Sequence, residues 1–512
     1  MDSKTKYMTE KERDRISGYI DDLRSIRAGT SHLVSEWNEI ERAYMGDQPV
    51  IPGMPNTRVN ILNMQVEGQT VEISENEINI SVRGIAPGDE LYARWAKTAL
   101  DWTIRKNNSR TLLSVFARRL IKFGTAWLKA EFDPDAADGF GLVRFNNVPA
   151  SNIYVDPMIT ETANLQKAEF IMETIEMTLE EADKLYGEKA ECIIPTHEFV
   201  KDIINNKMND ISGVRSRSFT LIQRWSRSNG KLRLEEFSEC GLLLYDSHKE
   251  GGRTVNQIES KEIPENYYSC VNDKYPYFAA VCYPVEGRFH GYGDGKLILR
   301  LQDMLNDLYD KIRIAARPNL ILYDTNAEAD LQNFDEFSFD PVPFNGDSSR
   351  EPIKAVQWGA INESWWRLLH SVHQEIQRVT RYGELMAGLS NTSSSATEAA
   401  IMHRQGNRAV SNKRTAVRQV LVQACEYAAG LMMEFNQGIK PFRTDDEGAG
   451  FEWIDFDKMR NVPVFMPPQS GYSRRYAETT GKAPDRQLLE HRGKIVTKNV
   501  ELDIQVGMGD AT

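Results

Sequence analysis

Three long helices are predicted between His290 and Gln437, and they constrain this chain more than any other feature. Apolar residues recur with helical spacing over 294–317 and 363–386, and a third helix is predicted over 396–436. Long helices gain most of their stability in proteins by burying an apolar stripe against another element. Copies repeated around an axis can supply that element, so the pattern favours a chain that assembles with itself.

The first two helices share one design, in which apolar residues follow one side. The stripe contains Leu297, Leu301, Met304, Leu305, Leu308 and Ile312 in the first helix, and Trp365, Leu368, Leu369, Val372, Ile376 and Val379 in the second. Asp303, Asp307 and Asp310 lie on the opposite side of the first helix. Pro318 ends that helix, because proline lacks a backbone donor and restricts the residue before it.

The remaining sequence mixes helical and strand patterns. Helices are predicted over 9–45, 89–107, 109–123 and 178–190, and strands over 71–73, 78–82, 125–132 and 141–155. A hairpin is predicted over 218–246, with Asn229-Gly230 at its turn. Shorter strands are expected at 320–323, 341–344, 353–358, 462–465 and 500–506. We therefore predict an α+β fold class.

Composition limits the classes of function. A chain of 512 residues is long enough for two to four folding units. Its net charge of −12 argues against tight binding of nucleic acid over a broad face, but not against a protein past which nucleic acid slides. Its five cysteines include no CxxC pair, so free thiols are expected. We expect no membrane span and no secretory signal, because no apolar run is long enough.

Each candidate motif for a cofactor, a metal or catalysis lacks a residue that such a site needs. Gly291-Tyr-Gly-Asp-Gly-Lys296 fails as a phosphate loop, because His290 stands at the first glycine position and Leu297 replaces the hydroxyl residue. A solvated face explains the three aspartates better than a cation site, since no other oxygen ligands match their spacing. His370 and His373 lack the glutamate of a zinc motif. The sequence therefore predicts no catalytic residue, no metal and no cofactor.

Two polar features adjoin the third helix. An uncharged loop over 387–395 ends in Ser390, Asn391, Thr392, Ser393, Ser394 and Ser395. Hydroxyl and amide groups can touch phosphates without the strong binding that lysines bring, although a polar linker would look the same. Ser395 and Glu398 form a capping box. The helix then carries a basic stripe of Arg404, Arg408, Arg414 and Arg418, which is either a solvated face or a surface for DNA or another subunit.

Several stretches together resemble the portal proteins of tailed bacteriophages, the head-to-tail connectors. They are Tyr44–Pro49, Arg58–Ile61, Phe123–Pro134, Val148–Pro157, His290–Asp294 followed by Leu301–Asp310, and Ser395–Glu398. The resemblance implies a division into a wing (1–289), a first stem helix (290–318), a clip (319–359), a second stem helix (360–386), a tunnel loop (387–395), a long helix (396–439) and a crown or C-terminal region (440–512).

The same resemblance implies a function. Portal proteins form a dodecameric ring at one capsid vertex, through which double-stranded DNA is packaged and ejected. The implied partners are a terminase motor, the major capsid and scaffolding proteins and a head-completion or adaptor protein, with assembly in the host cytoplasm. The tunnel loop would face DNA. The candidates to line the channel are Asp303, Asp307 and Asp310, with Arg404 and Arg408. The aspartates would give the wall a negative charge, which keeps a polyanion from sticking.

Two other classes remain as alternatives. A DNA-packaging enzyme, such as a terminase or nuclease subunit, would need a phosphate loop or a carboxylate cluster, and an ATPase assay would detect it. Another virion scaffold, such as a capsid or tail-tube subunit, would assemble into shells or filaments and not into closed rings.

Overall fold

The computed structural model forms two compact units, each built from segments distant in the sequence. The first unit comprises 1–35, 70–293 and 410–512, and the second comprises 36–69 and 294–409. The described residues are 7–47, 57–75, 78–85, 89–195, 197–200, 215–228, 231–247, 274–315, 320–323, 328–329, 344–345, 353–356, 363–380, 396–436, 438–443, 450–460, 462–463, 490–491, 494–495, 497–498 and 502–508. Three helices contribute residues to both units: α2 (Glu10–Met45), α3 (Ile61–Ser74) and α11 (Ala396–Phe435).

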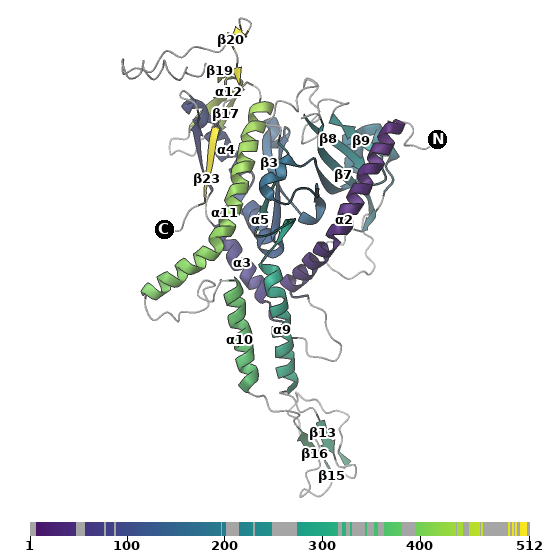
Figure 1. Cartoon of the computed structure of the whole chain (residues 1–512), viewed down its shortest axis with the longest axis vertical. Coiled ribbons are helices and arrows are strands. Elements are labelled where there is room, and N and C mark those ends of the chain that lie inside the picture. Colours follow the sequence, from purple (N-terminus) through teal and green to yellow (C-terminus); the bar gives the residue numbers. More distant parts are fainter. Residues whose placement is uncertain are drawn as a thin grey trace. The chain divides into compact units, whose positions relative to one another are not determined.

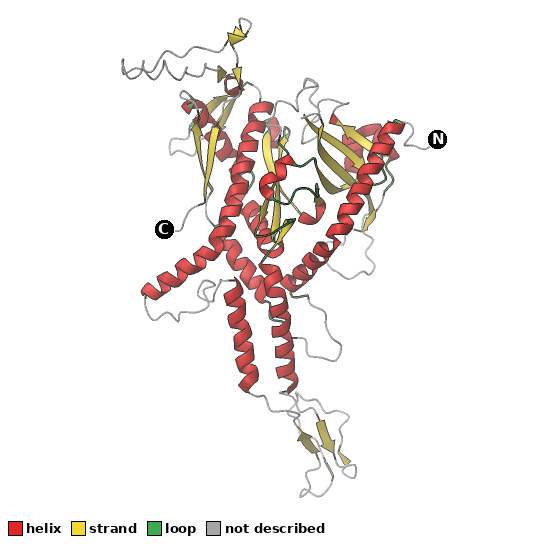
Figure 2. Cartoon of the chain, viewed as in Figure 1, coloured by secondary structure: helices red, strands yellow, loops and turns green. Residues whose placement is uncertain are grey.

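The first unit is organised around antiparallel sheets (Figure 2). The largest sheet contains β4 (Ile153–Val155), β5 (Phe170–Thr178), β7 (Arg215–Ser228), β8 (Lys231–Ser238) and β9 (Leu243–Asp246) in that order, with β6 (His197–Val200) also on β7. A second sheet has the order β10 (Tyr277–Val281), β2 (Thr125–Asp133), β3 (Leu142–Val148). Residues 218–226 of β7 are all buried, because both faces of the large sheet are covered.

The coverings of that sheet come from opposite ends of the sequence. Ile16, Ile20 and Leu23 of α2 join the buried apolar cluster of the large sheet, and so do residues of α7 (Leu179–Tyr186). Trp127 of β2 and Tyr277 of β10 are fully buried in the same cluster. Alternation along β8 therefore places consecutive side chains in different surroundings, one toward α2 and the next toward α7 and β2.

Smaller elements complete the unit. The helices are α4 (Glu90–Lys106), α5 (Ser109–Phe123), α6 (Ala136–Gly139), α12 (Phe456–Arg460) and the 3₁₀ turns η1 (Ala150–Asn152), η2 (Thr162–Lys167) and η3 (Gly187–Cys192). The strand pairs are β1 (Ile78–Gly84) with β23 (Leu502–Met508), β11 (Tyr283–Val285) with β12 (Arg288–Tyr292), and β17 (Ile439–Arg443) with β18 (Phe451–Asp455). Short pairs near the end are β19 (Val462–Pro463) with β22 (Thr497–Lys498), and β20 (Glu490–His491) with β21 (Lys494–Ile495).

The second unit contains two helices that run side by side, α9 (Asp294–Ala315) and α10 (Glu363–Thr380) (Figure 1). Between them in the sequence, β13 (Leu320–Tyr323) pairs with β16 (Ile353–Val356), and β14 (Glu328–Ala329) pairs with β15 (Phe344–Asn345). Leu305, Leu308 and Ile312 of the predicted stripe are buried on α9. Among the described helices, none is both long enough and apolar enough to cross a membrane.

The predicted α+β class is confirmed, and most predicted helices and strands are present. The strand predicted at 71–73 is wrong, because those residues end α3. The predicted helix over 178–190 is α7 followed by the turn η3. Residues 381–395, which include the predicted end of the second stem helix and the whole predicted tunnel loop, lie outside the described residues.

The compact units also divide the chain differently from the predicted segments. Residues 36–69, predicted as part of the wing, fold with α9 and α10. Strand β23, predicted at the end of the crown region, pairs with β1 of the predicted wing from Ile78↔Met508 to Gly84↔Leu502. Segments that a linear division separates are therefore joined by pairing across the length of the chain.

Candidate functional site

A row of polar side chains on α9 holds the segment that precedes α3. Gln302, Asn306 and Asp310 are spaced by four residues and so share one side of the helix. The hydrogen bonds run from Leu62 N to Gln302 Oε1 (2.8 Å), from Val59 N to Asn306 Oδ1 (2.9 Å) and from Thr57 N to Asp310 Oδ1 (2.9 Å). These side chains replace the backbone partners that a sheet would give to the segment, since buried N–H groups need acceptors.

The three predicted channel aspartates lie in different surroundings on α9. The Asp310 carboxylate also pairs with Arg58 at 3.3 Å, and both side chains are mostly buried. Asp303 is half-buried, and Arg300 lies 3.8 Å from its carboxylate on the same helix. Burial raises the pKa of Asp303, Arg300 opposes that shift, and the neighbouring Asp307 adds to it. Asp310 is therefore the aspartate of the three whose carboxylate both accepts a backbone N–H and pairs with Arg58 of the segment before α3.

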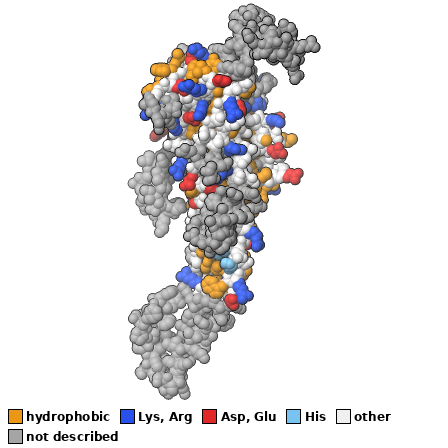
Figure 3. Space-filling view, turned by 90° about the vertical axis from the view of Figure 1, so that its left-hand side faces the viewer, with side chains coloured by type: hydrophobic (Ala, Val, Ile, Leu, Met, Phe, Trp, Pro, Cys, Tyr) orange, Lys and Arg blue, Asp and Glu red, His pale blue; other side chains and the backbone are white. Residues whose placement is uncertain are grey.

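Helix α10 leaves apolar side chains uncovered. Val372 and Ile376 of α10 are buried, whereas Trp366 is 51% exposed and Leu368 is 42% exposed. Met304 on α9 is 41% exposed although it belongs to the predicted stripe. Figure 3 shows apolar side chains gathered among charged ones on the face of the molecule that carries α10. Such an arrangement is typical of helices that pack against a further partner.

The basic stripe of α11 divides into two parts. The backbone of Arg404 and Arg408 is helical, but their side chains lie outside the part of the chain whose side chains are described. Arg414 pairs with Glu72 at 3.5 Å, and both side chains are largely buried. Arg418 is exposed and lines a groove. The stripe is therefore not one uniform surface.

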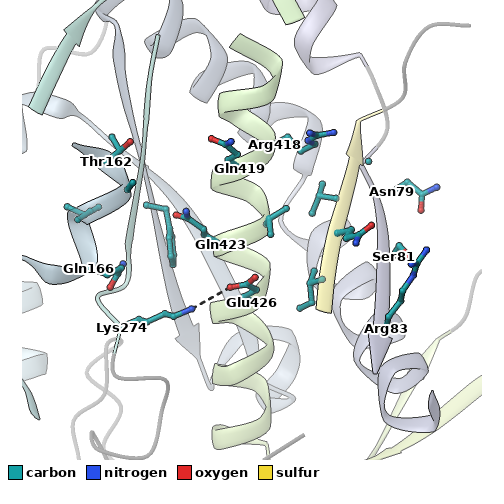
Figure 4. Close-up of a pocket in the computed structure, with 18 residues that line it drawn as sticks. Asn79, Ser81, Arg83, Thr162, Gln166, Lys274, Arg418, Gln419, Gln423 and Glu426 are labelled. Atoms are coloured by element: carbon teal, nitrogen blue, oxygen red, sulfur yellow. Dashed lines mark hydrogen bonds and ion pairs between the residues drawn. The ribbon is translucent and has the colours of Figure 1, made fainter. Parts of the chain in front are cut away.

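That groove lies within the first unit, between β10 with η2 on one side and β1 with β23 on the other (Figure 4). It has a volume of about 1090 Å³, and α11 forms its floor with Arg418, Gln419 and Gln423. Lys274 and Glu426 form an ion pair across it at 3.4 Å. Sequence patterns could not reveal this groove, because its walls come from strands at both ends of the chain.

A buried ionic cluster stabilises the two sheets of the first unit. Lys129 Nζ lies 2.6 Å from a Glu131 oxygen, 2.7 Å from Glu173 and 2.9 Å from Gln223. Burial lowers the pKa of Lys129, but the two glutamates outweigh burial and hold it well above its usual value. Because these charges are paired and away from the groove, we read the cluster as structural.

Neither metal-ligand clusters nor disulfides are found in the described part of the chain. Among those residues, no group of three or more His, Cys, Asp and Glu side chains is arranged to hold an ion. Cys192, Cys240, Cys282 and Cys425 are free thiols, as predicted, and Cys270 lies outside the described residues. His370 faces solvent and hydrogen-bonds Gln374 at 3.0 Å.

Comparison with known proteins indicates the class of protein to which this chain is similar. Residues 6–241 match the family model described as "Phage P22-like portal protein". The match confirms the resemblance to tailed-phage portal proteins, the structural head-to-tail connectors of bacteriophage. The matched span contains α2, the α4–α5 pair and most of the large sheet. No curated protein matches the chain.

Proposed function

We propose that the chain is the subunit of a dodecameric ring. This ring forms a channel for double-stranded DNA at one vertex of the capsid. The observation that carries the proposal is the paired stem, in which α9 and α10 lie side by side and leave Trp366, Leu368 and Met304 about half exposed. Exposed apolar side chains on long helices are stabilised when another copy of the chain covers them. In a closed ring every copy has such a neighbour. The portal-family match over the preceding residues supports the same assignment.

Within that ring we assign the segments as follows. The first unit acts mainly as the wing, α9 and α10 form the stem, and the β13–β16 and β14–β15 pairs form the clip. Residues 387–395 are the tunnel loop, with Ser390 to Ser395 toward DNA, and α11 leads to the crown. The terminase motor docks on the clip during packaging, and an adaptor or head-completion protein follows it there. The major capsid and scaffolding proteins surround the ring, which assembles in the host cytoplasm.

Asp303 and Asp307 are the side chains that we assign to the channel wall. Asp310, by contrast, pairs with Arg58 and accepts the backbone N–H of Thr57. The charge of Asp303 and Asp307 repels the phosphate backbone, so DNA passes without being held. Arg404 and Arg408 are the corresponding cationic candidates on α11.

Size-exclusion chromatography with light scattering tests the ring. The purified chain should elute as one closed species with a mass of about twelve subunits. A monomer at micromolar concentration, a continuous range of masses, or a filament would contradict the proposal. An ATPase assay on the same fraction should show no activity, and turnover would favour a packaging enzyme instead.

A further inference from the structure

The first unit carries an unbalanced positive groove on one side. Arg83 on β1 and Arg418 on α11 are both exposed, and neither guanidinium has a hydrogen-bond or ion-pair partner among the residues that the structure describes. Lys274 and Glu426 neutralise each other within the groove. The groove, defined here by Arg83, Lys274, Arg418, Gln419, Gln423 and Glu426, therefore has a net charge of +2 and unused amide groups.

An unbalanced negative surface lies on α7 and η3 of the same unit. Glu180, Asp183, Glu188 and Glu191 are exposed, and none of these carboxylates has an ion-pair partner among the described residues. Glu181 belongs to the capping box with Thr178 and so helps to begin the helix. We call the four free carboxylates the α7 surface; the exposed Ile194 adjoins it.

The two surfaces lie on different sides of the unit. The α7 surface rests on the large sheet, since α7 contacts β5 and β7, and Tyr186 donates to Glu236 of β8 at 2.9 Å. The groove lies at α11 and β23, and Figure 1 shows these elements across the unit from β7, β8 and β9. One copy therefore cannot fill its own groove with its own α7 surface.

We propose that the groove of each copy receives the α7 surface of the next copy. The proposal rests on the ring proposed above and specifies one of its contacts. A positive surface on one side and a negative surface on the other make a head-to-tail contact, which closes into a ring when the rotation allows. Complementary charges also fix register and disfavour wrong pairings. The amides of Gln419 and Gln423 are available as donors to the incoming carboxylates.

Charge reversal provides a test with internal rescue. Variant A carries Arg83→Glu and Arg418→Glu, which changes the net charge of the groove from +2 to −2. Variant B carries Asp183→Arg, Glu188→Arg and Glu191→Arg, which changes the net charge of the α7 surface from −4 to +2. Each variant alone places like charges at every contact, so each should shift from ring to monomer at low salt. Mixed in equal amounts, A and B should form rings again, because each groove then meets a surface of opposite sign. The variant that combines all the substitutions of A and B should form rings by itself.

The control variant makes the same change of net charge at residues outside the groove and the α7 surface. Lys97→Glu with Lys106→Glu alters exposed residues of α4 by the same total charge as variant A and should leave the ring intact. Circular dichroism checks that A and B remain folded. If the wild type is monomeric, the proposed ring itself fails. If the wild type forms rings and A and B do so equally well, or if mixing does not restore them, the ring stands and this contact is wrong.

Discussion

At the scale of single residues, the side chains of α9 show how a helix can be fixed by polar contacts. Gln302 and Asn306 are almost completely buried; Gln302 accepts the N–H of Leu62 in the first turn of α3, and Asn306 accepts the N–H of Val59 just before that helix. Burial of these two amide oxygens is tolerated because each accepts a hydrogen bond. This row sets which side of α9 is covered and leaves Asp303 and Asp307 on another side.

Replacing Asn306 tests this row. Asn306→Leu keeps the volume similar but leaves the N–H of Val59 without an acceptor, which costs about 1–3 kcal/mol of unfolding free energy. Denaturant titration measures that loss, and hydrogen exchange of residues 57–62 should accelerate. Asp307→Asn, one residue along on an exposed position, should change neither quantity. Equal exchange in both variants would show that Asn306 does not hold the segment.

The thiols give a second prediction at this scale. Burial raises the pKa of Cys425 to about 12, so the thiol stays protonated across the neutral and mildly alkaline range. Alkylation needs the thiolate, and Cys425 in the folded chain should therefore resist iodoacetamide at about pH 8.5, where an ordinary thiol is half ionised. The partly exposed Cys192 and Cys240 should be labelled first. Mass spectrometry reads the sites, with denatured chain as the control, and early labelling of Cys425 would contradict the burial.

At the scale of elements, the junction between α5 and β2 depends on a glycine. Gly124 ends α5 with φ +84°, and a Cβ atom there would overlap the backbone of Tyr292. Because backbone cannot rotate away as a side chain can, the close approach of these strands requires glycine at this position.

Replacing each of two glycines by alanine separates the cost of backbone strain from the cost of atomic overlap. Gly139 has a similar φ, +82°, but open space around it, so Gly139→Ala should cost only the strain of about 1–2 kcal/mol. Gly124→Ala should lower the free energy of unfolding by clearly more, since the β12 backbone must also move. Thermal or denaturant unfolding gives both values. Equal losses would mean that the overlap is relieved without cost.

Elements with strong periodicity were predictable, and elements that depend on distant partners were not. Apolar spacing identified α9 and α10, because one side of each helix is buried. α3 was missed, since it buries Gln65, Gln69 and Thr70 on several sides and so lacks an apolar stripe. The β1–β23 pair joins the two ends of the chain, and no local pattern encodes that pairing.

The candidate site was predictable only in part. The aspartates of α9 were identified from their spacing, but their shared side suggested one surface, whereas Asp310 binds Arg58 and the N–H of Thr57. Nothing in the spacing of Asp310 distinguishes it from Asp303. The groove was missed because exposed Arg83 and Arg418 are brought together only by the fold.

At the scale of the whole molecule, the proposed channel wall gives a prediction about DNA movement. Asp303→Asn with Asp307→Asn removes two negative charges per copy and keeps side-chain volume, so DNA should be held more strongly and packaging should slow. An in vitro packaging assay measures the rate. Asp310→Asn is unsuitable as a wall probe because it also weakens the contact with Arg58. Glu363→Gln with Glu375→Gln, exposed or partly exposed on α10, provides the matched control, and equal rates in all chains would argue against a repulsive wall.

The family match ends before α9, so the proposed ring rests on the side-by-side packing of α9 and α10 and on the exposed apolar residues of α10. Electron micrographs of the purified chain test this claim most directly. We predict closed rings with an open central channel wide enough for a DNA duplex. Solid particles without a channel, or single copies with Trp366 and Leu368 left in solvent, would contradict the account.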